Sequence, residues 1–255
     1  MIITTLGSGT SSGVPNVAFG FGDCNPANAK NQRLRCSLFI EVGREKILID
    51  TSPDLRQQLL RANISDLTAV LYTHDHADHC HGIDDLRPIV GKRGAPLPAY
   101  FTAATATSIQ KKFSYIFTTP SHLPASDYPP LLVPHVIDGV FYVGEEKITA
   151  FTQQHGHSIS TGFRIGNFAY STDVSHLDES AFAVLAGVEL WVVDALQPKP
   201  HGSHSHLDRT LEWIARVKPK RAYLTHMNIA MDYDWARDHC PPGVAPLYDG
   251  LVLEL

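Results

Sequence analysis

Short apolar runs separated by loops dominate the hydrophobic pattern of the chain. The run at residues 69–72, Ala69-Val70-Leu71-Tyr72, is long enough for a buried strand and too short for a stable helix. Similar runs predict strands at 2–6, 38–42, 46–50, 99–102, 147–151, 162–166, 168–171, 190–194 and 222–225. Helical spacing and end signals predict helices after Pro53 with Ser52 as N-cap, at 105–113, at 178–185 and from Ser205 through Val217. Two β-rich halves with flanking helices therefore predict an α+β fold.

One segment interrupts this order. Residues 114–134 are rich in proline, serine and aromatic residues, which predicts a variable loop region of undefined role.

Polarity changes abruptly after the run at 69–72. Residues 74–79, His74-Asp75-His76-Ala77-Asp78-His79, supply three imidazoles and two carboxylates within six positions. Both groups are ligands of divalent metals. Because a core strand holds the residues after it on a rigid support, the pattern predicts a metal site at this strand end.

The order His-x-His-x-Asp-His directly after an apolar strand resembles the signature of the metallo-β-lactamase superfamily. This resemblance implies a four-layer αββα sandwich, here as one domain over residues 1–255, and two divalent metal ions, either zinc or manganese. Carried over, His74 and His76 would bind the first ion, and Asp78 and His79 the second. Asp75 lies between ligands and receives no role.

The same resemblance implies three further ligands at later strand ends. His155 is preferred as the third histidine because its spacing to Gly162-Phe163-Arg164 resembles that of relatives, and His157 remains the alternative. Asp173 matches the bridging carboxylate, and His226 matches the last ligand. Asp50, at the end of a predicted strand, is expected to hold a ligand loop by hydrogen bonds.

Two segments resemble the phosphodiesterase-like members of the superfamily, with the phosphoribosyl 1,2-cyclic phosphate phosphodiesterases the nearest group. Residues 5–15 match their glycine-rich opening and are expected near the metal site. His204 matches their proton donor, a role that His201 or His206 could also fill. The implied reaction is hydrolysis of a small or cyclic phosphodiester of nucleotide or ribose type by a metal-bound hydroxide, with His204 and Asp78 as catalytic residues.

Composition restricts the alternatives. The formal net charge of −5 disfavours a nucleic-acid substrate without excluding one, because phosphate neutralisation requires clustered lysine and arginine. A ribonuclease Z-like tRNA 3′-processing endonuclease is therefore the second hypothesis, and a thioester or lactone hydrolase of the same superfamily is the third. Lys30, Arg33 and Arg35 have two interpretations, contact with substrate phosphate or a solvated basic loop.

Cysteine content and apolar runs complete the expectations. The four cysteines form no CxxC pair, and the lack of a cluster around Cys24 predicts that the extra structural zinc of some relatives is absent. No signal peptide is recognisable and no apolar run approaches the ~18 residues of a membrane span, so a cytoplasmic protein is expected. A homodimer is suggested by family resemblance alone.

Overall fold

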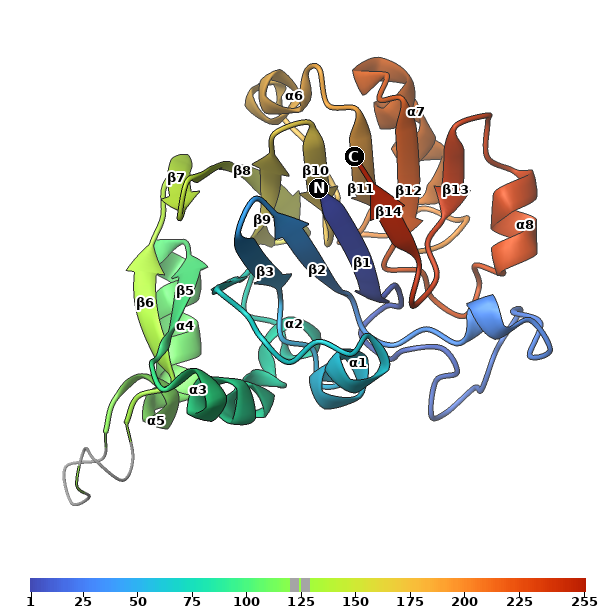
Figure 1. Cartoon of the computed structure of the whole chain (residues 1–255). Helices are drawn as coiled ribbons and strands as arrows, with labels where there is room; N and C mark the ends of the chain where they lie inside the picture. The colour runs from blue at the N-terminus through green and yellow to red at the C-terminus, as the bar shows by residue number, and fades with distance from the viewer. Residues whose placement is uncertain (120–123, 125–128) are drawn as a thin grey trace.

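The computed structural model describes residues 1–119, 124 and 129–255, and consists of two seven-stranded sheets (Figure 1). The first sheet has the order β14-β1-β2-β3-β4-β5-β6 and the second the order β13-β12-β11-β10-β9-β8-β7. The strands of the first sheet are β1 (Ile2–Gly7), β2 (Ser37–Val42), β3 (Glu45–Ile49), β4 (Ala69–Leu71), β5 (Leu97–Phe101), β6 (Leu132–Val136) and β14 (Val252–Glu254). Those of the second are β7 (Val140–Val143), β8 (Glu146–His155), β9 (Ser158–Ile165), β10 (Phe168–Ser171), β11 (Leu190–Asp194), β12 (Arg221–Thr225) and β13 (Val244–Pro246).

Helices cover the outer face of each sheet. The helical segments are α1 (Leu55–Arg61), α2 (Ala77–Cys80), α3 (Arg87–Arg93), α4 (Ala103–Lys112), α5 (Ser114–Phe117), α6 (Glu179–Leu185), α7 (Leu207–Val217) and α8 (Tyr233–Asp238), with short 3₁₀ turns η1 (Ala29–Asn31) and η2 (Ile83–Leu86). None of these described helices is long and apolar enough to cross a membrane.

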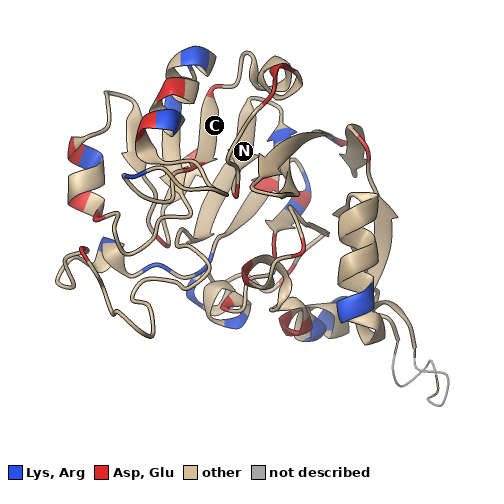
Figure 2. Ribbon diagram, turned by 180° about the vertical axis from the view of Figure 1, so that it is seen from behind, with Lys and Arg blue, Asp and Glu red and all other residues tan. Residues whose placement is uncertain are grey.

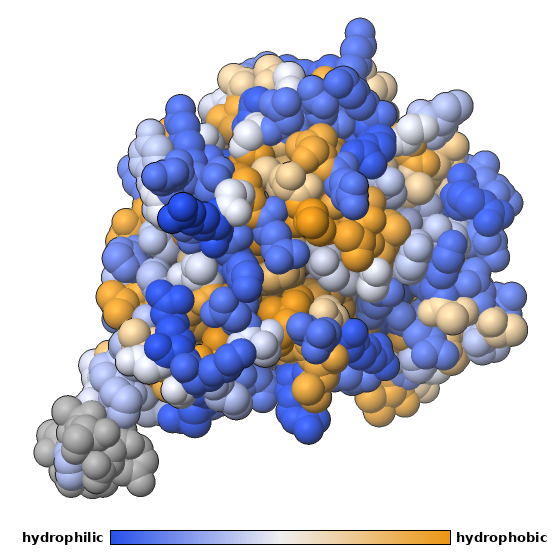
Figure 3. All heavy atoms as spheres, viewed as in Figure 1, coloured by the Kyte–Doolittle hydropathy of each residue, from blue (hydrophilic) through white to orange (hydrophobic). Residues whose placement is uncertain are grey.

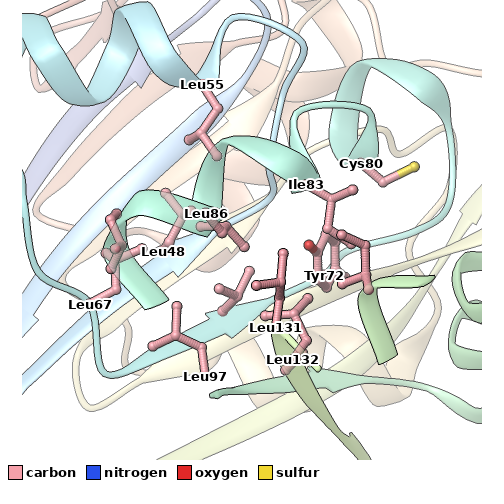
Figure 4. Close-up of a cluster of buried hydrophobic side chains, with 14 of the residues drawn as sticks. Leu48, Leu55, Leu67, Tyr72, Cys80, Ile83, Leu86, Leu97, Leu131 and Leu132 are labelled. Carbon is pink, nitrogen blue, oxygen red and sulfur yellow. The ribbon is translucent and has the colours of Figure 1, made fainter. Parts of the chain in front are cut away.

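Three apolar clusters define the layers. One lies between the sheets, where alternating residues such as Ile40 and Ile47 of the first sheet meet Phe163 and Val192 of the second. Another lies between the first sheet and its helices, and Figure 4 shows part of it, including Leu48, Leu55 and Leu86. The third packs the second sheet against α6, α7 and α8. This arrangement is the predicted four-layer αββα sandwich.

The outer surface on the side of Figure 1 is mostly polar, with apolar atoms exposed between polar side chains (Figure 3). Acidic and basic positions are interspersed along the helices seen from behind (Figure 2). The charge therefore does not separate into one basic and one acidic half of the described chain.

Two local predictions were wrong. Part of the segment 114–134 is regular, because α5 lies within it and the edge strand β6 begins in it at Leu132, although residues 120–123 and 125–128 are outside the described part. Pro134 made this strand look like a loop, but an edge strand tolerates proline because one side of it needs no ladder donor.

Ser52 is not the N-cap of α1, since the helix begins at Leu55 with Asp54 in the cap position. The carboxylate of Asp54 instead accepts a hydrogen bond from the backbone of Arg35 at 2.9 Å and pairs with its guanidinium at 3.1 Å.

Candidate metal centre

The predicted ligands come together because they follow strands that end at the same edge. The loop after β4 carries His74 and His76, and α2 follows it directly with Asp78 and His79. In the second sheet β10, β11 and β12 run parallel, so the residues after β10 and β12 meet beside the end of β8. All seven predicted ligands are gathered there: His74, His76, Asp78, His79, His155, Asp173 and His226.

The first group of donors contains His74, His76, His155 and Asp173. The Asp173 Oδ2 atom lies 3.8 Å from His74 Nε2 and 3.6 Å from His155 Nε2, and His155 Nε2 lies 3.3 Å from His76 Nδ1. His157 is exposed and belongs to none of these groups of described residues. The geometry therefore brings His155, and not His157, to the cluster.

The second group contains Asp78, His79, Asp173 and His226. The Asp173 Oδ1 atom lies 3.1 Å from His79 Nε2 and 3.3 Å from His226 Nε2. Asp78 Oδ2 lies 3.2 Å and 3.4 Å from the same two nitrogens. One oxygen of Asp173 thus faces each group, which is the position of a carboxylate that bridges two ions.

The donor set fits two divalent cations. His74 Nε2 and His79 Nε2, which face these groups, are buried imidazole nitrogens without a hydrogen-bond partner among the described residues, an arrangement that is costly unless something binds there. Asp173 and His226 also have left-handed backbones, with φ of 52° and 59°. Such conformations are uncommon outside glycine and concentrate at functional sites.

The electrostatics of two of the ligands, His74 and Asp78, point the same way. Burial, followed by the nearby positive charge of His79, lowers the pKa of His74 well below its usual value. Burial alone would raise the pKa of Asp78, but the charge of His79 and the hydrogen bond from His226 lower it overall. Neutral imidazole and ionised carboxylate are the forms that bind metal.

Asp50 supports the ligand loop, as predicted. Its Oδ2 atom lies 2.7 Å from His79 Nδ1 and accepts a hydrogen bond from the Thr73 hydroxyl at 2.7 Å, while Oδ1 accepts from the Thr73 backbone at 2.8 Å. In the neutral form that binds a metal, the Asp50 carboxylate therefore keeps the proton of His79 on Nδ1 and leaves Nε2 free, on the side of Asp78 and Asp173.

Asp75 has a role that sequence reasoning missed. Its carboxylate accepts hydrogen bonds from Ser108 and, at 2.6 Å, from Lys112, both on α4. Lys112 also donates to the Asp75 carbonyl at 2.5 Å. The loop between His74 and His76 is thereby fastened to the helical layer.

His204 also reaches the cluster. Its Nε2 atom lies 3.9 Å from Asp173 Oδ2, and its ring stacks on that of His226 at 4.6 Å. Asp194, predicted only as the last residue of a strand, accepts a hydrogen bond from His204 Nδ1 at 2.9 Å. Burial lowers the pKa of His204, but Asp194 and the other carboxylates outweigh it and raise the pKa to about 9.

The signal for Asp194 was its place at the end of a buried strand, which Asp50 and Asp173 share. His201 and His206 were the other two candidates for the proton donor. The ring of His201 lies 5.4 Å from that of His204, and His206 occupies the N-cap position of α7.

The glycine-rich opening lies beside the centre, as predicted. Thr10 N donates to the carbonyl of Met227, the residue after His226, and Met227 N donates to the Ser8 carbonyl. A Cβ atom on Gly9 would lie 2.9 Å from the Cβ atom of Arg33, so only glycine permits this close approach.

The three basic residues of the following loop have partners within the protein. Arg33 is 2% exposed and donates to Asn31 and to the Asn228 carbonyl, so neither interpretation of it holds. Arg35 is paired with Asp54, as described above. The Lys30 ammonium lies 4.4 Å and 4.6 Å from the ring centres of Tyr233 and Tyr248.

Comparison with known proteins defines the class. Residues 45–227 match the family model of the β-lactamase superfamily domain, and the chain belongs to this superfamily. The fold and the histidine and aspartate clusters make it a metallo-β-lactamase-fold hydrolase by family. The resemblance seen in the sequence is thereby confirmed at that level.

Two relatives are similar over nearly the whole chain. A protein of Porphyromonas gingivalis (strain ATCC BAA-308 / W83) named octanoyltransferase is 34% identical over 254 residues, which cover 96% of this chain and 50% of the relative. The chain thus spans about half the length of this curated relative. The crystal structure of a diphosphatase of the PhnP family is 32% identical, has a TM-score of 0.91 and matches over 100% of this chain and 97% of that chain.

More distant structures share the fold alone. Zinc-bound PqqB from Methylobacterium extorquens is 19% identical with a TM-score of 0.78, and both chains are covered completely. The short form of human tRNase Z is 18% identical with a TM-score of 0.69, over 100% of this chain and 99% of that chain.

Proposed function

We propose that this chain is a dinuclear metal-dependent phosphodiesterase that hydrolyses a small or cyclic phosphodiester of nucleotide or ribose type. The observation that carries the proposal is the single carboxylate of Asp173, which faces two groups of buried donors at once, with His204 beside it. Many enzymes that cleave phosphate esters use a pair of metal ions to stabilise both the attacking and the leaving oxygen.

Each group would hold one ion through its own donors. His74, His76, His155 and one oxygen of Asp173 would bind the first, and Asp78, His79, His226 and the other oxygen the second. The bound ions would supply Lewis-acid stabilisation of the phosphoryl charge and activation of a water molecule. Imidazole and carboxylate together suit zinc and also manganese.

His204 is the proton donor in this proposal. Asp194 accepts from its Nδ1 atom, so its Nε2 atom faces the cluster, where the phosphorus–oxygen bond would break. A protonated His204 can transfer the Nε2 proton to the leaving oxygen while water adds to phosphorus. Asp78 lies between His79 and His226, where it would help to hold a metal ion and would orient the attacking water.

A second candidate substrate class is a diphosphate. The relative at 32% identity, which covers this whole chain, is described as a diphosphatase. Cleavage of a P–O–P bond and of a P–O–C bond both require stabilisation of charge on the phosphoryl group. A leaving phosphate is less basic than a leaving alkoxide, so it depends less on a proton donor. Dependence on His204 therefore separates the two classes.

Octanoyl transfer is not carried over, because the relative with that name is about twice as long as the matched region. The tRNA-processing hypothesis remains disfavoured by the net charge of −5. A panel of substrates tests these hypotheses. A cyclic nucleotide, a nucleoside diphosphate sugar, a precursor tRNA and a thioester are each offered to metal-loaded protein.

The decisive variants are His74→Ala, Asp173→Ala and His204→Ala. The first two are expected to lose bound metal, by elemental analysis, and all hydrolysis. His204→Ala is expected to retain both ions and lose about 10²–10⁴-fold in turnover of a phosphodiester. His157→Ala is the matched control, an exposed histidine of the same segment, and should keep metal and activity. Full activity of metal-free protein would overturn the proposal.

A further inference from the structure

A hollow of about 530 Å³ lies among segments that neighbour the metal ligands in the chain, and none of the predicted ligands lines it. It is formed by the loop at residues 23–25, the loop after β11 and the start of α8. Its walls are Asp23, Cys24, Asn25, Pro198, Ala230, Asp232 and Trp235. In Figure 1 the loop after β1 and helix α8 lie side by side at the same end of the molecule.

Two walls of the hollow belong to chain segments that also carry residues of the metal centre. Ala230 is four residues after His226, so its Cα atom lies at most about 14 Å from that of His226. Pro198 lies between Asp194 and His204 in the chain. Hydrogen bonds from Asn228 N to the Leu196 carbonyl and from Asn228 Nδ2 to Gln197 Oε1, both at 2.9 Å, join the two walls.

The third wall is anchored to the same place. Asp23 N donates to the Ile229 carbonyl at 2.8 Å, and the Cys24 thiol lies 3.5 Å from that oxygen. The hollow and the second group of metal ligands are therefore joined by one short segment, residues 226–230, with His226 at one end and Ala230 at the other.

The lining suits a flat aromatic ring with a polar edge. Trp235 is 37% exposed, whereas Trp191 and Trp213 are 0% and 9% exposed, and one face of its indole already stacks on His239 at 4.0 Å. Pro198 and Ala230 add apolar surface. Stacking on an aromatic side chain is a general way to bind a nucleobase.

The polar rim supplies both kinds of hydrogen-bonding group. Both oxygens of Asp232 are occupied, by Asn25 N, Asn31 Nδ2 and Trp235 N. The carboxylate of Asp23 is exposed and accepts no hydrogen bond from the described residues, and Asn25 uses only its Oδ1 atom, toward Ala27 N. An acceptor and an amide donor thus remain for the edge of a base.

We propose that this hollow binds the nucleobase of the substrate, with Trp235 as the stacking surface and Asp23 and Asn25 reading the base edge. The inference rests on the proposed function, which places a phosphodiester at the metal centre. It names the substrate class as a nucleotide and distinguishes it from a base-free ribose phosphate. A negative rim also disfavours a second phosphate at this position.

Kinetics with paired substrates test the proposal. Adenosine 2′,3′-cyclic phosphate and the base-free ribose cyclic phosphate are compared in the wild type and in Trp235→Leu, with Trp235→Phe to preserve an aromatic ring. In Trp235→Leu, KM for the nucleotide is expected to rise about tenfold with kcat nearly unchanged, and KM for the base-free substrate is expected to stay constant. Tyr142→Leu, which removes an exposed aromatic ring on β7, is the matched control.

Direct binding separates this inference from the proposed function. Adenosine, which has no phosphate, is titrated into metal-free protein while tryptophan fluorescence is recorded; quenching in the wild type that is lost in Trp235→Phe supports the hollow as a base site even if no phosphodiester is cleaved. Hydrolysis of both cyclic phosphates with equal KM, unchanged in Trp235→Leu, would overturn the inference and leave the proposed function standing. Absence of quenching by adenosine would also overturn it.

Discussion

Replacement of Asp50 by asparagine tests how the metal centre is built. Asparagine has nearly the same shape as aspartate and tolerates the left-handed backbone at this position, where φ is 62°. The Thr73 backbone N–H can only donate, so the amide oxygen of the introduced asparagine must stay where Asp50 Oδ1 is. The amide NH₂ then takes the place of Oδ2 and faces His79 Nδ1.

This change moves the proton of neutral His79 from Nδ1 to Nε2. Opposite an NH₂ group, Nδ1 must act as an acceptor, so the proton moves to Nε2, the atom that lies 3.1 Å from Asp173 and 3.2 Å from Asp78. A protonated Nε2 has no lone pair for a metal. The Thr73 hydroxyl also lies 3.0 Å from His74 Nδ1, so we expect a smaller loss of affinity for the first ion as well.

The expected magnitude is a 10- to 100-fold loss of affinity for the second ion, which corresponds to about 1.4–2.7 kcal/mol. Calorimetric titration of metal-free protein with zinc measures both affinities, and thermal unfolding confirms that the variant folds. Asp66→Asn, an exposed carboxylate paired with Lys46, serves as the control and should bind both ions normally. Unchanged affinity for both ions in Asp50→Asn would refute the reasoning.

Three other variants probe the surroundings. Gly82→Ala would place a Cβ atom 1.9 Å from the Ser52 carbonyl oxygen, so the loop after α2 must shift; we expect lower thermal stability and weaker binding of the second ion, and normal values for both would contradict the contact. Lys112→Met should loosen the loop at Asp75 and so raise KM or lower the affinity for the first ion, and Lys112→Arg should restore the wild-type values. A methionine variant with normal KM and normal affinity would exclude a role of Lys112 in fixing this loop. Burial raises the pKa of Asp249 to about 7, so its folded form keeps a proton that the unfolded chain releases near pH 4. The stability of the wild type relative to Asp249→Asn should therefore fall by up to about 4 kcal/mol from pH 4 to pH 7 in urea unfolding of metal-free protein, and a pH-independent difference would show that Asp249 does not titrate in this range.

Strand ends were the most predictable part of this molecule. An apolar run that turns polar marks the point where a buried strand reaches the sheet edge. This signal located His74, and it agreed with the resemblance that implied Asp173 and His226. It works because burial and chemistry change at the same residue. The αββα layering was implied by the resemblance to the superfamily, and the two β-rich halves with flanking helices agreed with it.

Contacts between distant segments were not predictable in the same way. The grip of Lys112 on Asp75 spans 37 positions and depends on how α4 packs, which leaves no local pattern. Asp194 had the right place but no visible partner, because His204 lies on an irregular loop. The strand β6 was missed because proline is a common turn signal, whereas an edge strand tolerates Pro134.

The shared carboxylate of Asp173 has a consequence for assembly of the chain. Donors at residues 74–79 lie on one sheet, and those at 155, 173 and 226 lie on the other, so no complete site exists until both sheets have closed on each other. During synthesis the N-terminal half would emerge with an incomplete donor set and would have to wait for the second sheet to supply its partners. Ions bound there would fasten one sheet to the other, and the stability of the sandwich would rise with the logarithm of free metal concentration. Metal supply would then govern how long the folded protein survives, as well as how fast it works.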